Sequence, residues 1–156
     1  MSAASEDNPG VIAFPPLIFA TCALLGAGAH WLWPLPLLPA LAARVIGAAL
    51  AVAAGTQAIW AARSMRRAGT NVNPSQPALA IVVAGPYTYT RNPMYLSLCT
   101  LQVGLGLLLN GLLPVLFIIP LALILQFGVI KREERYLTAK FGENYLAYQR
   151  RVRRWV

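Results

Sequence analysis

Residues 85–97 read Gly-Pro-Tyr-Thr-Tyr-Thr-Arg-Asn-Pro-Met-Tyr-Leu-Ser, and they join a polar, cationic loop to a long apolar run. The run extends from Met94 to Ile130 and holds 37 residues without Asp, Glu, Lys, Arg or His. Asn92-Pro93 is typical of a helix start, because the Asn amide accepts from unpaired backbone N–H groups and Pro has no N–H to satisfy. Tyr, Arg and Asn side chains therefore gather where the chain enters a membrane. This pattern alone fits either a ligand site or an anchor at the lipid headgroups.

Composition places the chain among multi-pass membrane proteins. Its 156 residues fit one domain, and a mean hydropathy of +0.58 with only 12% charged residues does not fit a soluble globular protein. The net charge of +8 comes from basic residues that flank apolar runs, so we do not expect nucleic acid as a partner. Cys22 and Cys99 lie inside apolar runs without metal-ligand spacing, and no metal site is predicted.

Four apolar segments are predicted to cross the membrane. Residues 1–10 are polar and predicted to be disordered, and a single membrane domain follows over residues 11–156. The 37-residue run is too long for one crossing of about 20 residues, and the turn dipeptide Asn110-Gly111 divides it into a helical hairpin. The predicted crossings are residues 11–33, 38–62, 93–109 and 112–130. We expect an all-α integral membrane protein with about four transmembrane helices.

The first arm of this hairpin is short for a crossing. Residues 93–109 span about 25 Å at helical rise, against about 30 Å of hydrocarbon. The corner at Arg91, Asn92 and Pro93 is therefore expected below the membrane surface, unless the bilayer thins there. A polar, non-helical corner at that depth is tolerated where protein buries it or where it lines a cavity, which favours a pocket.

Small residues recur every four positions in the second apolar segment, at Ala43, Gly47, Ala51 and Gly55. Such a stripe lets two helix backbones approach closely in a membrane, where lipid supplies no hydrophobic drive for association. We expect this face to pack against a neighbouring helix. Pro120 is predicted to kink the last crossing.

The tail at residues 131–156 is predicted to be an amphipathic helix, with a break at Gly142. Four crossings place this tail on the same side as the loop at residues 63–92. Together the two segments hold 12 of the 13 Lys and Arg residues. By the positive-inside rule, both termini, the corner and the tail are predicted to lie in the cytoplasm.

Glu133 and Glu134 open this tail and are predicted to lie near the Arg91 corner, at the other end of the same hairpin. Adjacent residues differ by about 100° around a helix, so one carboxylate can face a ligand while the other braces an arginine. The neighbouring Lys and Arg residues lower the pKa of this pair and burial raises it, and the sequence does not rank the two effects. A solvated helix face that pairs with its own arginines is the alternative interpretation.

The order of these motifs resembles the integral membrane methyltransferases of the isoprenylcysteine carboxyl methyltransferase and phospholipid N-methyltransferase family. The resemblance covers residues 69–155 and rests on two blocks, one on each side of the apolar hairpin. They are Gly85-x-Tyr87-x-x-x-Arg91-Asn92-Pro93-x-Tyr95 and Glu133-Glu134-x-x-Leu137-x-x-x-Phe141-Gly142-x-x-Tyr145-x-x-Tyr148-x-x-Arg151-Val152. Two positions depart from the family pattern. Asn92 stands where many members carry His and cannot titrate, and Ser97 stands where Gly is common.

The resemblance implies methyl transfer from S-adenosylmethionine without a Rossmann domain, to a lipophilic acceptor that enters from the bilayer. The implied cofactor-binding residues are Gly85, Tyr87, Arg91, Asn92, Pro93, Tyr95, Glu133 and Glu134, and the implied catalytic residues are Glu134 and Arg151. The residue types agree with a zwitterionic sulfonium. A carboxylate suits its amino group, Arg91 suits its carboxylate, and tyrosine faces suit adenine or the sulfonium. Arg151 is the residue expected to orient an anionic acceptor.

The acceptor stays open, because prenylated cysteine, a phospholipid amine, an isoprenoid and a small thiol or phenol all fit an apolar hairpin with a polar mouth. Three other functions compete with methyl transfer. A sterol or isoprenoid reductase with a nicotinamide cofactor has similar motifs but more crossings. A proton-coupled transporter needs ionisable residues within its spans, where only Arg44 is charged. A non-catalytic scaffold would follow if Asn92 and Ser97 marked a decayed site.

Overall fold

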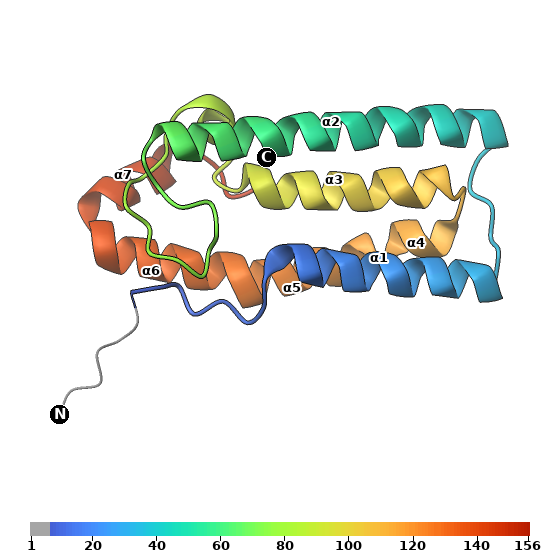
Figure 1. Cartoon of the computed structure of the whole chain (residues 1–156), viewed down its shortest axis with the longest axis horizontal. Coiled ribbons are helices and arrows are strands. Elements are labelled where there is room, and N and C mark those ends of the chain that lie inside the picture. The colour runs from blue at the N-terminus through green and yellow to red at the C-terminus, as the bar shows by residue number, and fades with distance from the viewer. Residues whose placement is uncertain (1–6) are drawn as a thin grey trace.

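The computed structural model describes residues 7–156, and its regular elements over this range are all helices. They are α1 (Pro15–Leu32), α2 (Ala40–Arg67), the 3-10 helix η1 (Gly85–Thr88), α3 (Pro93–Leu108), α4 (Leu112–Leu116), α5 (Ile118–Ile124), the π-helix η2 (Leu125–Ile130), α6 (Lys131–Phe141) and α7 (Glu143–Arg151). In Figure 1, α2 lies beside α3, and α1 runs along α4 and α5. The predicted all-α fold is confirmed.

Within residues 7–156, three helices are long and apolar enough to cross a membrane: α1, α2 and the rod from Leu112 to Phe141 that α4, α5, η2 and α6 form together. The fourth predicted crossing, α3, has 16 residues and spans about 24 Å at helical rise. Large apolar side chains face outward from the bundle, with Leu24, Leu41 and Val52 exposed by 73%, 77% and 70%. Such surfaces suit contact with lipid.

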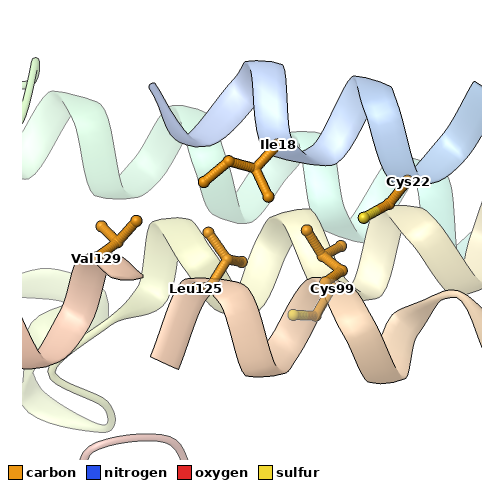
Figure 2. Packing of buried hydrophobic residues seen from close by; sticks show 6 residues of the cluster. Ile18, Cys22, Cys99, Leu125 and Val129 are labelled. Atoms are coloured by element: carbon orange, nitrogen blue, oxygen red, sulfur yellow. The ribbon is translucent and has the colours of Figure 1, made fainter. Parts of the chain in front are cut away.

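The largest apolar cluster joins α1, α3 and the rod. Figure 2 shows Ile18 and Cys22 of α1 on the side that faces Leu125 and Val129 of η2, and Cys99 of α3 belongs to the same cluster. All five side chains are buried. This packing fixes the two arms of the hairpin to each other, so the start of α3 and the start of α6 are held at the same end of the bundle.

Close backbone packing joins α2 to α3 at two glycines. A Cβ atom on Gly47 would lie 2.8 Å from the carbonyl oxygen of Gly104 and 2.7 Å from the backbone nitrogen of Leu108. The predicted small-residue stripe is confirmed at Gly47, but it is wrong at Gly55, which is exposed with nothing within 4 Å of its Cβ position. Because a straight helix has 3.6 residues per turn, a spacing of four drifts around the helix, and the buried position moves to Ala54.

Two breaks divide the last third of the chain. The rod is interrupted at Phe117, where the prolyl nitrogen of Pro120 has no hydrogen to donate to the carbonyl of Leu116 four residues earlier. The predicted break at Gly142 is confirmed, since α6 ends at Phe141 and Gly142 has a φ of +55°, which glycine adopts without strain. This break turns α7 back towards the start of α3 (Figure 1).

The segment before α1 lies along the rod. Of the ten N-terminal residues predicted to be disordered, residues 1–6 lie outside the described residues. Asp7 contacts Lys140, the carbonyl of Gly10 accepts from Arg132, and the N–H of Ile12 donates to the carbonyl of Gly128 at 3.2 Å. Residues 7–12 are thus joined to η2 and α6.

Candidate functional site

A hollow of about 850 Å³, partly open to solvent, lies where the start of α3 meets α6 and α7. The residues that line it come from five regions: Pro9 before α1, Met65 in α2, the loop residues Thr70, Asn71, Val72, Asn73, Pro74, Gln76, Ala78, Ala80, Ile81 and Val82, the corner residues Tyr87, Arg91, Asn92, Pro93, Met94 and Tyr95, and the tail residues Glu133, Glu134, Tyr136, Leu137, Tyr145 and Tyr148.

Seven of the nine sequence-predicted site residues line this hollow: Tyr87, Arg91, Asn92, Pro93, Tyr95, Glu133 and Glu134. Two do not. Gly85 packs against α2, where a Cβ atom would lie 2.4 Å from the Ser64 hydroxyl, and its φ of +64° suits glycine, so its place is in the turn. Arg151 is exposed at the end of α7 and lies outside the residues that line the hollow.

The two glutamates have different partners. Glu134 is 8% exposed, and Arg154 binds it through two nitrogens, with Nη2 to Oε2 at 2.6 Å and Nε to Oε1 at 3.0 Å. Nη1 of Arg91 lies 3.2 Å from Oε1 of the same carboxylate. Glu133 accepts a hydrogen bond from the Tyr95 hydroxyl at 2.6 Å, which is the one hydrogen bond to its carboxylate among residues 7–156. Glu134 is therefore saturated by arginines, and Glu133 retains acceptor capacity.

The corner before α3 is held by the end of the chain rather than by its own cap. Asn92 precedes α3 at the cap position, but its side chain makes no capping hydrogen bond. The prediction that its amide accepts from backbone N–H groups is therefore wrong: its Nδ2 donates to the carbonyl of Arg154 at 2.8 Å. The backbone N–H of Arg91 donates to the carbonyl of Arg153 at 2.9 Å. On the other side, Gln57 of α2 donates to the carbonyl of Pro93 at 3.1 Å.

Tyrosines form much of the remaining wall. The Tyr148 hydroxyl donates to the carbonyl of Tyr87 at 2.7 Å and ties α7 to η1. Burial raises the pKa of Tyr148 and of Tyr87 well above the usual value, and burial raises the pKa of Tyr145 to about 12. These phenols therefore stay protonated near neutral pH and act as hydrogen-bond donors and aromatic surfaces.

Three segments that border the hollow meet at one hydroxyl group. Tyr136 of α6 accepts from the backbone N–H of Ala78 at 3.1 Å and donates to the carboxylate of Asp7 at 2.7 Å. Lys140 lies 3.0 Å from the same hydroxyl and pairs with Asp7. The loop, the N-terminal segment and α6 thus meet at Tyr136, with Pro9 beside them in the lining.

Sequence reasoning missed three parts of this site: Arg154, the loop at residues 70–82, and Tyr136. Arg154 is one of four basic residues in the tail after Glu143, and the pattern does not distinguish it from its neighbours. The sequence of the loop could have indicated its place in the site, because Asn71, Asn73 and Gln76 are polar residues next to a cationic segment. Tyr145 and Tyr148 of the predicted amphipathic tail also line the hollow.

Comparison with known proteins agrees with this arrangement. The family model of the phospholipid methyltransferases matches residues 42–144, which include most of α2, the corner, the hairpin and the glutamate pair. An uncharacterized protein of Haemophilus influenzae is 41% identical over 63 residues, which is 40% of this chain and the whole of that protein. No solved structure matches the chain significantly. Because the family model covers well over half of the sequence, the chain belongs to the phospholipid methyltransferase family, a family of membrane methyltransferases.

Proposed function

We propose that this protein is an S-adenosylmethionine-dependent methyltransferase that binds its methyl donor in the hollow and methylates a lipophilic acceptor. The observation that carries the proposal is the convergence of Arg91, Tyr95 and Glu133 on one cavity from the two ends of the hairpin. Membership of the phospholipid methyltransferase family supports the reaction class.

The side chains in the hollow match the groups of the proposed donor. The Glu133 carboxylate has acceptor capacity for an ammonium group. The Nε atom of Arg91 is buried and has no hydrogen-bond partner among the described residues, so this guanidinium retains a donor for a carboxylate. Tyr87, Tyr145 and Tyr148 present aromatic faces that suit a purine or a sulfonium.

S-adenosylmethionine, when bound, supplies an electrophilic methyl group on sulfur. The residues of this chain bind and orient the two reactants, because an in-line displacement depends on their alignment. They also exclude water from the site. Tyr95 orients the Glu133 carboxylate, and the saturated ion pairs of Glu134 keep the corner rigid. The protonated tyrosine hydroxyl groups do not provide a strong base near neutral pH. This favours acceptors that are nucleophilic without one, such as a thiolate or a carboxylate.

Calorimetric titration of the detergent-purified protein with S-adenosylhomocysteine tests the donor site. We expect saturable binding by the wild-type protein and a loss of about tenfold or more in Glu133→Gln, because that variant removes the anionic acceptor. Glu143→Gln is the matched control, since Glu143 lies on the exposed side of α7. Equal affinities in the two variants would remove Glu133 from the site. Absence of binding to the wild-type protein, together with saturable binding of a nicotinamide nucleotide, would refute the proposed function.

The proposed orientation places the hollow and the N-terminal segment on the cytoplasmic side. Single-cysteine labelling with a membrane-impermeant reagent in sealed inverted vesicles tests it. Ser75→Cys in the loop is expected to react, and Leu37→Cys between α1 and α2 is expected to be protected. The two native cysteines are buried, so their background reactivity is low. Reaction of Leu37→Cys alone would reverse the orientation.

A further inference from the structure

The last residues of the chain return across the molecule to the corner before α3 (Figure 1). The indole N–H of Trp155 donates to Gln126 of η2 at 2.8 Å, and this bond joins the segment to the rod. The carbonyl of Arg153 accepts from the N–H of Arg91, and the carbonyl of Arg154 accepts from the Asn92 amide and from the Thr90 hydroxyl at 3.2 Å. Two consecutive carbonyls therefore hold three consecutive residues of the corner.

The side chain of Arg154 acts on the same site from a second direction. Its guanidinium contacts both oxygens of Glu134, and this leaves Arg91 a single contact at 3.2 Å with one of them. A bidentate guanidinium–carboxylate pair is geometrically specific and strong. Without it, both oxygens of the buried Glu134 would be open to Arg91, and a carboxylate in that position draws the nearest cation.

We propose that residues 153–155 form a positioning element for the methyl-donor site, in which Arg154 occupies Glu134 and thereby keeps the Arg91 guanidinium facing the hollow. Arg154 acts through Glu134 and Arg91, and it does not line the hollow itself. This inference rests on the proposed function, because it assigns the freed guanidinium to the donor carboxylate. It gives one of the tail arginines a role beyond membrane topology.

Arg154→Met and Arg153→Met form a matched pair for the test. Both variants remove one charge from the same segment, but the Arg153 side chain is exposed. Within residues 7–156, Arg153 is hydrogen-bonded to the corner through its backbone carbonyl. We expect the dissociation constant for S-adenosylhomocysteine to rise by about 10- to 100-fold in Arg154→Met, since small displacements of binding groups have effects of this size. Arg153→Met is expected to bind as the wild-type protein does. Arg154→Lys is expected to restore part of the affinity, because the charge remains and the planar fork is lost.

A double-mutant cycle separates positioning from a general loss of structure. If Arg154 acts through Glu134, the combination of Glu134→Gln with Arg154→Met weakens binding no more than the worse single change. Additive losses, or wild-type affinity in Arg154→Met, would overturn the inference and leave the donor site in place. If Arg154→Met does not fold, wild-type affinity in Arg154→Lys would overturn it equally. Absence of binding to the wild-type protein would remove the donor site, and this role of Arg154 with it.

Discussion

Replacement of Gly47 by Ala tests the close contact between α2 and α3. The added Cβ atom would lie 2.7 Å and 2.8 Å from two backbone atoms of α3, about 0.6–0.7 Å nearer than ordinary contact at 3.4 Å. Because the neighbours are backbone, they relieve the overlap only by moving one helix, and such overpacking costs about 1–3 kcal/mol. Ala is also the better helix former by about 1 kcal/mol, so the net loss in Gly47→Ala is about 0–2 kcal/mol.

Gly55→Ala is the matched control, since it makes the same chemical change in the same helix with nothing within 4 Å of the new atom. The gain in helix propensity is common to both variants and cancels in their comparison. We expect Gly47→Ala to be less stable than Gly55→Ala by about 1–3 kcal/mol, the overpacking cost alone. Reversible unfolding in mixed micelles, followed by circular dichroism, measures this difference. Equal stabilities would refute the close approach of the two helices.

Two further perturbations probe the hollow and the segment that covers it. Tyr95→Phe is expected to lower the free energy of unfolding of the ligand-free protein by about 1–3 kcal/mol, because Glu133 loses the hydroxyl that donates to it, whereas Tyr89→Phe at an exposed site is expected to leave stability unchanged. Comparable losses in both variants, measured by the same unfolding assay, would contradict this role of Tyr95. The hydrogen bond from Lys140 holds the pKa of Asp7 below its usual value, so attachment of the N-terminal segment is expected to persist at neutral pH and to be lost as the pH falls through that lowered pKa. Cleavage of the segment by an acid-active protease should therefore rise steeply only in strong acid, and Asp7→Asn should abolish the step; a step that survives in Asp7→Asn would point to another group.

Much of the architecture could be predicted from the sequence, because membrane insertion depends on local composition. A 37-residue run without charge is too long for one crossing, and the helices on each side of Asn110-Gly111 follow from that length. The hairpin brings its two ends together, so the proximity of Arg91 to the glutamate pair could be predicted without knowledge of side-chain packing. The spacing of about 100° between adjacent helix positions also predicted that Glu133 and Glu134 would have different partners.

The remaining features depend on contacts between distant parts of the chain. Arg154 lies 20 residues from its carboxylate partner Glu134, and nothing in the local pattern separates it from the exposed Arg153. The Asn92 side chain matched a capping residue, but the returning carbonyl of Arg154 takes its amide instead. The stripe was wrong at Gly55 because a spacing of four does not follow one line on a straight helix. These outcomes depend on tertiary contacts that periodicity does not encode.

The meeting of three segments at the Tyr136 hydroxyl has a mechanical consequence. The loop at residues 70–82 and the N-terminal segment border the hollow and have no regular secondary structure. Hydrogen bonds and an ion pair that involve partly solvated groups such as Asp7 and Lys140 attach them to α6. Ion pairs of this kind are individually weak, whereas the apolar packing of α1 and α3 against the rod is not. Loss of these few hydrogen bonds and of the ion pair would therefore open the hollow to solvent, while the packing between α1, α3 and the rod would stay unchanged.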